Sequence, residues 1–379
     1  MTARTRLYVA TMAVVALPVF GAEARSLTPL YSFIDRADGG LPEAGPTLIA
    51  GDLFGTTNQG GDGNYGTVFE VNPQSGAETT IYSFKSGADG ANPETGVVYK
   101  GDWLYGATYS GGGAGCMVIG CGTVFKINPK TGMETVLHSF TGLSDGSNPW
   151  SSILYKGGML YGTTAGGGSS SHGVVFKIDP KTGAETAIYS FQGGTDGSYP
   201  FGLIFRGGTL YGTTYNGGAG AGTIFALSPV TGVETVAYSF KGGTDGQAAV
   251  GLVYKAGNLF GATSEGGASG YGTVFKFNLK TGIESPLYSF NGTTDGQGPG
   301  VLSYWAGNLI GTCRGGASSF GNLFKVNVAT GIETVLHIFT DQDDGGYPNG
   351  ALIDEAGTIY GTTNGGGAPG YGTVFKLSP

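Results

Sequence analysis

The chain contains nearly the same nineteen residues twice, GTVFKINPKTGMETVLHSF at residues 122–140 and GVVFKIDPKTGAETAIYSF at residues 173–191. Each copy has two runs of β-branched and aromatic residues, which favour β-strands. The runs are separated by a P-K-T-G turn, in which Pro presets φ and Gly can take a positive φ. Each copy therefore predicts two neighbouring antiparallel strands, which we name C and D.

These two strands are part of a longer unit that recurs along the chain. Within residues 149–199 the unit reads PWSSILYKGG, MLYGTTAGGG, HGVVFKIDPKTG and AETAIYSFQGGTDGSY, which predicts four strands, A to D. The Phe that closes each D strand recurs at intervals of 51, 56, 51, 49, 50 and 49 residues. A period near fifty built from short strands is typical of a β-propeller. These residues are Phe33, Phe84, Phe140, Phe191, Phe240, Phe290 and Phe339.

The number of strands predicts how the ring closes. Seven glycines stand in B strands, seven open C strands, and seven D strands follow, but the turn from C to D, T-G-x-E or in the first unit S-G-A-E, occurs only six times. The chain ends on a C strand (GTVFKLSP) and begins with a D strand (LTPLYSF), so residues 27–34 should complete the last blade. We predict an all-β, seven-bladed β-propeller of four-stranded antiparallel blades, closed by the N-terminal strand and monomeric.

The start of the chain differs from the repeats. MTARTR is followed by the apolar run LYVATMAVVALPVF and by Ala22-Glu23-Ala24, a pattern typical of a secretory signal peptide. We interpret residues 1–24 as this signal and residues 25–379 as the propeller, exported to the periplasm or the cell exterior. The fourteen-residue apolar run is short for a span, which needs about 20 residues, and no membrane span is expected. A net charge of −8 without a basic run argues against nucleic acid as partner.

The unit G-x-L-Y-G-T-T…GG…G-T-V-F-K-x-x-P-x-T-G-x-E-T-x-x-Y-S-F…D-G-x-x-P resembles the GloVer-type tandem repeat of "choice-of-anchor" exported bacterial proteins. The likeness covers residues 27–379. It implies an exported or surface protein of bacteria with a propeller-like fold and no established activity. The resemblance supplies no catalytic residues. The GG doublets and the period are also kelch-like.

Histidine is the commonest general base, and the chain has three. His138 and His337 occupy the slot that holds Tyr in the other D strands, and His172 occupies a slot that otherwise holds Tyr or Phe. We interpret all three as packing residues. No Ser–His–Asp or Cys–His constellation is visible in the sequence.

An Asp-Gly pair occurs in every crossing from strand D to the next strand A. Such a pair suits a turn, because the carboxylate can accept a nearby backbone N–H. Its presence in all seven units indicates a part of the fold. The functional alternative is that these aspartates form a ring of Ca²⁺ sites. Each crossing supplies only one carboxylate, however, whereas Ca²⁺ is bound by several oxygen ligands. No cofactor or metal site is predicted otherwise. The glutamates after the C–D turns are interpreted as surface residues at strand starts: Glu78, Glu134, Glu185, Glu234, Glu284 and Glu333.

The cysteines mark a departure from the repeat. The interval from the B-strand Gly to the C-strand Gly is 10 or 11 residues except in the second unit, where it is 16. Cys116 and Cys121 both lie in this enlarged loop, and in an exported protein they predict a disulfide. A metal pair is the weaker alternative. Cys313 is expected to be a buried free thiol, and the neighbouring Arg314, unique at its slot, a solvated charge.

Positions that differ between the units are the better candidates for function. Around the B–C loops and D–A crossings, which should share one face of the ring, aromatic residues concentrate on the second to fourth units. Exposed rings on a rigid face can stack on sugars or anchor a protein partner. The alternative is that they pack under their own loops. The candidate binding residues are Tyr109, Trp150, Tyr199, Phe201 and Tyr215.

We therefore predict an exported binding or interaction module that recognises carbohydrate or a surface protein through one loop face. The alternatives are a polysaccharide-active lyase or hydrolase with its acid and base carboxylates in the central funnel, and a purely structural envelope protein. An enzyme would need a non-repeated acid, base or His that converges on the funnel. The sequence alone assigns no catalytic residue.

Overall fold

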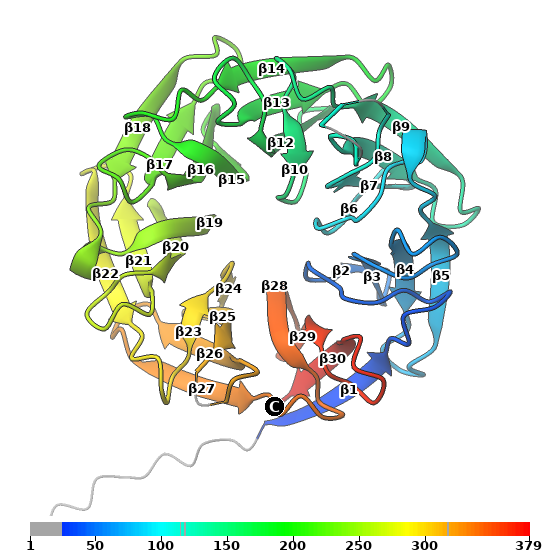
Figure 1. Ribbon diagram of the computed structural model, residues 1–379. Coiled ribbons are helices and arrows are strands. Elements are labelled where there is room, and N and C mark those ends of the chain that lie inside the picture. Colours follow the sequence, from blue (N-terminus) through cyan, green and yellow to red (C-terminus); the bar gives the residue numbers. More distant parts are fainter. Residues whose placement is uncertain (1–24, 114, 117–118, 317) are drawn as a thin grey trace, which may run out of the picture.

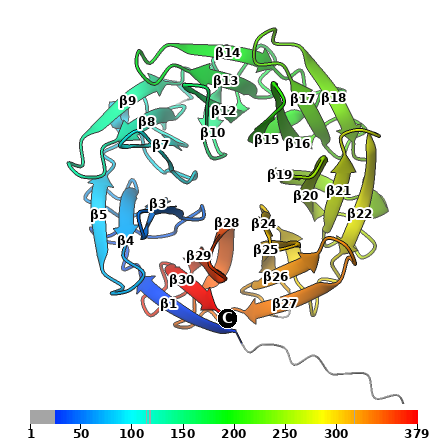
Figure 2. The same cartoon turned by 180° about the vertical axis from the view of Figure 1, so that it is seen from behind.

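The structure, a computed structural model, describes residues 25–113, 115–116, 119–316 and 318–379, so the predicted signal peptide lies outside the described residues. Its strands form seven separate antiparallel sheets that stand around one axis (Figures 1 and 2). The predicted seven-bladed propeller is confirmed. Two short 3-10 turns, η1 (Gly87–Asp89) and η2 (Gly243–Asp245), lie in D–A crossings. In the part of the chain that the structure describes, no helix is long and apolar enough to cross a membrane.

Strand A lies nearest the axis and strand D outermost (Figure 1). The A strands are β2 (Thr47–Ile49), β6 (Val98–Lys100), β10 (Ser147–Pro149) with β11 (Leu154–Lys156), β15 (Ser198–Arg206), β19 (Gln247–Lys255), β23 (Gln297–Pro299) with β24 (Ser303–Trp305), and β28 (Gly346–Glu355). The B strands are β3 (Asp52–Thr57), β7 (Trp103–Thr108), β12 (Met159–Gly166), β16 (Thr209–Asn216), β20 (Asn258–Glu265), β25 (Asn308–Gly315) and β29 (Thr358–Gly365).

The C strands are β4 (Thr67–Val71), β8 (Thr123–Ile127), β13 (Val174–Ile178), β17 (Thr223–Leu227), β21 (Thr273–Asn278), β26 (Asn322–Asn327) and β30 (Thr373–Ser378). The D strands are β5 (Glu78–Ser83), β9 (Glu134–Ser139), β14 (Glu185–Ser190), β18 (Glu234–Ser239), β22 (Ile283–Ser289), β27 (Glu333–Ile338) and β1 (Ser26–Ser32). We number the blades 1 to 7 in this order, so that blade 7 consists of β28, β29, β30 and β1.

The N-terminal strand closes the ring as predicted. Strand β1, blue in Figures 1 and 2, pairs antiparallel with the red β30, from Ser26 opposite Ser378 to Ser32 opposite Thr373. Directly after β1, the buried Phe33 packs edge-on against Phe69 of blade 1, with ring centroids 5.1 Å apart. The first strand thus fills the outer edge of blade 7 and also contacts the next blade.

A repeated glycine–phenylalanine contact builds the core of each blade. In blade 2, Gly106 pairs with Phe125, and a Cβ added at Gly106 would lie 2.5 Å from the ring atom Cζ. The C-strand Phe in turn meets the D-strand Phe of the preceding blade. Seven such edge-on pairs, at 4.9–5.5 Å, join all neighbouring blades around the ring. Burying each of these side chains contributes about 1.5–3 kcal/mol.

The Asp-Gly crossings are held by the same two hydrogen bonds in every blade. In the crossing from blade 4 to blade 5, the Tyr238 hydroxyl donates to Asp245 at 2.7 Å, and the backbone N–H of Lys241 donates to the same carboxylate at 2.7 Å. His138 and His337 take the place of Tyr, with Nε2 3.2 and 3.0 Å from Asp145 and Asp344. These histidines pack edge-on against Phe140 and Phe339 as expected, and they also hydrogen-bond to the aspartate of the crossing.

The glutamates after the C–D turns are not simple surface residues, and that interpretation was wrong. All six are half-buried, and the Oε1 atom of five of them is buried without a hydrogen-bond partner. Burial, followed by the charge of the crossing aspartate of the preceding blade, raises the pKa of Glu134 to about 7. For Glu284, burial and Asp245 raise the pKa to about 8. The sequence did not indicate this contact because the two carboxyls belong to different repeats.

Candidate functional site

The D–A crossings and the B–C loops meet on one face of the ring, as predicted, and we call it the loop face. Backbone hydrogen bonds join them, for example from Asn58 N–H to Leu41 C=O at 3.0 Å and from Tyr109 N–H to Asn92 C=O at 3.0 Å. The residue before the usual Pro of each crossing has a φ between 53° and 61° in all seven blades. This left-handed backbone is therefore part of the fold.

A cavity of about 890 Å³ opens along the propeller axis, and we call it the axial cavity. Every blade contributes to its wall, because the innermost strands converge on the axis (Figure 1). The slot that follows the Pro position lines the cavity in all seven blades, and its residue type changes from blade to blade. The slot holds Glu43, Glu94, Trp150, Phe201, Val250, Gly300 and Asn349.

One side of the axial cavity is an aromatic cluster built on blades 3 and 4. The ring of Trp150 lies 5.5 Å from that of Phe201 and 6.4 Å from those of Tyr199 and Tyr215. The indole Nε1–H of Trp150 donates to the carbonyl of Pro200 at 2.9 Å, which fixes the ring. Tyr199 is 43% exposed, and the other three are half-buried. These four predicted residues therefore form one surface in the cavity.

Tyr109, the fifth predicted residue, does not line the axial cavity. It is half-buried, and its carbonyl accepts a hydrogen bond from the side chain of Asn148 at 3.0 Å. Burial first, and then the nearby Glu94 and Tyr199, raise the pKa of the Tyr109 hydroxyl. Tyr109 therefore lies outside the lining of the cavity but near Glu94 and Tyr199.

The other side of the axial cavity is polar. Glu43 accepts hydrogen bonds from the side-chain amides of Asn349 and Asn364, each at 2.7 Å and on different carboxylate oxygens. The guanidinium of Arg314 donates to the Oδ1 of Asn349 at 3.4 Å. The side-chain amides of Asn349 and Asn364 therefore orient the Glu43 carboxylate. Asn349 also accepts from the exposed guanidinium of Arg314, so Arg314, Asn349 and Glu43 form one hydrogen-bonded series.

Glu94 lies in the same wall as Glu43 but in a different environment. It is half-buried and lines the axial cavity. Burial first, and then the negative charge of Glu43, raise the pKa of Glu94 to about 7, while Arg314 acts in the opposite direction. The two carboxyls are therefore in different environments, since two amides donate to Glu43, whereas burial and the charge of Glu43 raise the pKa of Glu94.

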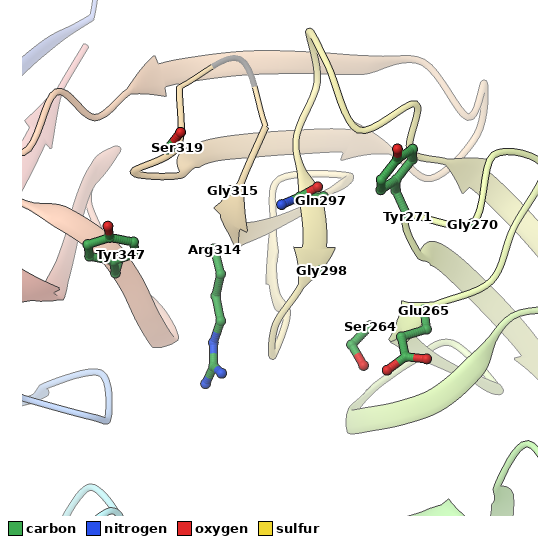
Figure 3. A pocket seen from close by; sticks show the side chains of 10 residues that line it. All are labelled: Ser264, Glu265, Gly270, Tyr271, Gln297, Gly298, Arg314, Gly315, Ser319 and Tyr347. Atoms are coloured by element: carbon green, nitrogen blue, oxygen red, sulfur yellow. The ribbon is translucent and has the colours of Figure 1, made fainter.

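A second hollow of about 510 Å³, the side pocket, adjoins the axial cavity and shares Ser264, Glu265, Gly298 and Arg314 with it. Figure 3 shows Arg314 extending from the end of β25, with Tyr347 on one side and Gln297 and Tyr271 on the other. The Arg314 side chain is exposed, as expected for a solvated charge, yet it lines both hollows.

Sequence reasoning did not assign Glu43, Glu94 and Arg314 to a site. The signal was present, because all three stand at slots whose residue type varies between the repeats. Their convergence depends on ring closure, since Glu43 of blade 1 contacts Asn349 of blade 7 across 306 residues of sequence. Within the described ranges, no group of three His, Cys, Asp or Glu residues could hold a metal ion. Calcium binding by the crossing aspartates stays a prediction.

The cysteines lie where the sequence predicts. Cys116 and Cys121 form a disulfide, with Cα atoms 5.2 Å apart, in the enlarged B–C loop of blade 2 on the loop face. Cys313 is a buried free thiol in β25, at the slot that holds Thr in the other blades. The pKa of the Cys313 thiol is raised well above its ordinary value, mainly by burial.

Comparison with known families gives one match, the Gloeobacter/Verrucomicrobia repeat, over residues 19–221, 118–319 and 203–379. A search of the curated proteins found no relative by sequence. Among solved structures, an oligogalacturonate lyase in complex with manganese is similar with a TM-score of 0.60 and 10% identity, over 94% of each chain. A puromycin-hydrolyzing peptidase of Mycobacterium tuberculosis has a TM-score of 0.56 and 10% identity, over 87% of this chain and 51% of the other. At these identities the likeness shows the fold alone.

Proposed function

The chain belongs to the Gloeobacter/Verrucomicrobia repeat family, and from this premise we propose that it is an exported binding module that recognises carbohydrate in its axial cavity. The volume of about 890 Å³ lies in the range of about 300–1,000 Å³ typical of small-ligand sites. A disulfide in the enlarged loop of blade 2 is consistent with an oxidising compartment.

The aromatic cluster next to the polar wall carries this proposal. A sugar ring has an apolar C–H face and a rim of hydroxyl groups. The face can stack on Trp150 and Tyr199, which offer large, rigid rings at the cavity wall. The hydroxyl rim can bond to the carboxylate of Glu43 and to the amide of Asn349, and charged acceptors form the stronger hydrogen bonds.

Binding of the chain from residue 25 to a broad glycan array tests this proposal. We expect Trp150→Ala combined with Tyr199→Ala to remove binding, because exposed aromatic anchors each contribute about 2 kcal/mol or more, which is about 30-fold in affinity. Dissociation constants of the parent and the variant for the best array hit, measured by calorimetry, give the size of the effect.

Tyr65→Ala is the matched control, since Tyr65 is also an exposed loop residue, at 38%, but does not line the cavity. Its variant should bind like the parent. An unchanged affinity in the Trp150/Tyr199 variant, with an unchanged melting temperature, would place the binding site elsewhere. If the parent protein binds no glycan on the array, this result would contradict carbohydrate recognition and favour a surface protein as the partner.

A polysaccharide-active enzyme is the second candidate, and one observation favours it. Glu43 and Glu94 are carboxyls of neighbouring blades in one cavity wall; two amides donate to Glu43, and burial and the charge of Glu43 raise the pKa of Glu94 to about 7. Pairs of this kind can divide general-base and general-acid roles. Glu94→Gln should then keep ligand binding and abolish release of reducing ends from the bound glycan. A parent protein that binds this glycan without cleaving it is a binding module only.

A further inference from the structure

The face opposite the loop face is formed by the A–B and C–D turns, and we call it the turn face. Backbone hydrogen bonds join the two sets of turns, from Leu279 N–H to Gly257 C=O and from Val328 N–H to Gly307 C=O, each at 3.1 Å. In blade 1 the side chain of Asn72 donates to Asp52 at 2.7 Å in the same way. The two sets of turns are therefore one continuous surface.

Positive charge concentrates on the turn face of blades 2 to 5, against the net charge of the chain, which is −8. The A–B turns of these blades begin with an exposed Lys or Arg, and three of their C–D turns contain an exposed Lys. These seven cations face only two acids in the same turns, Asp102 and Asp179, whereas the turns of blades 6, 7 and 1 contain no Lys or Arg. The A–B cations are Lys100, Lys156, Arg206 and Lys255, and the C–D cations are Lys130, Lys181 and Lys280.

Aromatic rings hold several of these cations in place, and no ion pair within the described residues neutralises them. Lys156 lies over the ring of Phe205 at 5.3 Å, Arg206 over Tyr254 at 4.6 Å, and Lys255 over Tyr304 at 4.8 Å, so three of the four A–B cations stack on the next blade. Within the described residues, the charge pairs within 4.0 Å are His–Asp pairs on the loop face. The carboxyls of the glutamates that follow the C–D turns are directed into the blade boundaries, where their Oε1 atoms are buried.

Aliphatic side chains stand beside these cations at the tips of the C–D turns. Val230 is 90% exposed, Val233 and Ile283 are each 63% exposed, and Met133 is 57% exposed. Large apolar side chains at this exposure contribute nothing to the core of the blades. Together with the seven cations they form a surface that we call the turn patch.

We propose that the turn patch docks on the surface of an anionic lipid bilayer. A bilayer surface offers both complements at once, since lipid phosphates attract Lys and Arg and the boundary of the acyl chains accepts exposed aliphatic side chains. A soluble polyanion would match the charge but leave Val230 and Ile283 in water. In this orientation the loop face, with the axial cavity, points away from the membrane.

Co-sedimentation of the chain from residue 25 with vesicles tests the proposal. We expect the protein to sediment with phosphatidylcholine vesicles that contain phosphatidylglycerol, not with phosphatidylcholine alone, and to be released by salt. Lys130→Glu combined with Lys181→Glu should weaken binding about tenfold or more, since each Lys near an anionic surface contributes measurably. Val230→Ser combined with Ile283→Ser should weaken it similarly, because the aliphatic contact is lost without a change of charge.

Lys85→Glu combined with Lys241→Glu is the matched control, because it makes the same charge change at exposed residues of the loop face. It should change binding by no more than about twofold, at an unchanged melting temperature. Three outcomes overturn the proposal: equal sedimentation with both kinds of vesicle, no sedimentation with anionic vesicles at low salt, and an affinity that the Val230/Ile283 variant leaves unchanged. The last result, with tight binding of soluble heparin, would indicate a polyanion as partner instead.

Discussion

At the scale of single residues, the repeat separates side chains that build the ring from those that vary. No larger residue fits at Gly106 or its equivalents, because the Phe ring of strand C occupies the space that a Cβ atom would need. The crossing slot before Pro needs a positive φ, which Asn or Gly adopts most easily. Tyr199 and Tyr347 adopt φ values of 56° and 54° there, and both remain more than 40% exposed. Large exposed rings at such a backbone position mark the loop face as a surface for contacts.

Gly106→Ala tests the steric role of the core glycine. We expect it to lower the free energy of unfolding by about 1–3 kcal/mol, because the added methyl overlaps the ring of Phe125. Gly194→Ala is the control, since a Cβ there meets no atom within 4 Å and its φ is not positive. Urea unfolding of both variants measures the difference. Equal stability of the two would show that the ring of Phe125 can move aside at no cost.

At the scale of elements, six of the seven D strands have a carboxyl group near each end, and β1 has one only at its end. The crossing aspartate accepts hydrogen bonds at the end of the strand, and the glutamate at its start lies near the aspartate of the preceding blade. Burial, then the preceding aspartate, raises the pKa of five of the six glutamates to about 7 and that of Glu284 to about 8, from an ordinary value of 4.5. The blade boundaries therefore bind protons more tightly than the unfolded chain does.

The stability of the protein should consequently fall as pH rises between about 4.5 and 7. Over this range the unfolded chain has released these protons while the folded chain retains them, so the free energy of unfolding decreases with pH. The effect per group is reduced by solvent, since each glutamate is only half-buried. Urea unfolding at pH 5 and pH 8 measures it. A combined Glu134→Gln, Glu185→Gln and Glu234→Gln variant should show a smaller pH dependence, and an unchanged dependence would assign the effect to other groups.

At the scale of the whole molecule, closure of the ring completes blade 7 and the wall of the axial cavity. Strand β1 supplies the outer edge of blade 7, and Phe33 supplies one of the seven inter-blade contacts. The same closure places Glu43 beside Asn349 and Asn364, and thereby forms the polar wall of the axial cavity. A chain that failed to close would lose this wall along with the edge strand.

Deletion of residues 27–34 should therefore sharply lower the melting temperature, because it exposes the edge of β30. If the deleted chain does not fold, Phe33→Ala tests the same contact, with an expected loss of about 3–5 kcal/mol. Phe84→Ala is the matched variant for a contact inside the ring, between blades 1 and 2. A Phe33 variant as stable as the parent, alongside a destabilised Phe84 variant, would contradict closure by the N-terminal strand.

Much of the architecture could be predicted from the sequence, because every blade repeats the same pattern of strand and turn residues. Turn residues, the period near fifty and the missing seventh C–D turn were sufficient for the number of blades and for closure. The four residues of the aromatic cluster were all predicted, whereas the fifth predicted residue, Tyr109, does not line the axial cavity. Glu94 and Arg314 were not assigned to a site, since a carboxyl and a guanidinium in different repeats give no sequence signal of their distance.

The sequence by itself therefore determined the strands, their number, the ring and the disulfide, which follow from the pattern within each repeat and from the number of repeats. Only the tertiary structure decided which varying side chains share a cavity, which carboxyls perturb each other, and which turns form one patch. The physical reason is that these properties depend on distances between side chains of different blades. Such distances follow from the stacking of seven blades around one axis rather than from any local pattern.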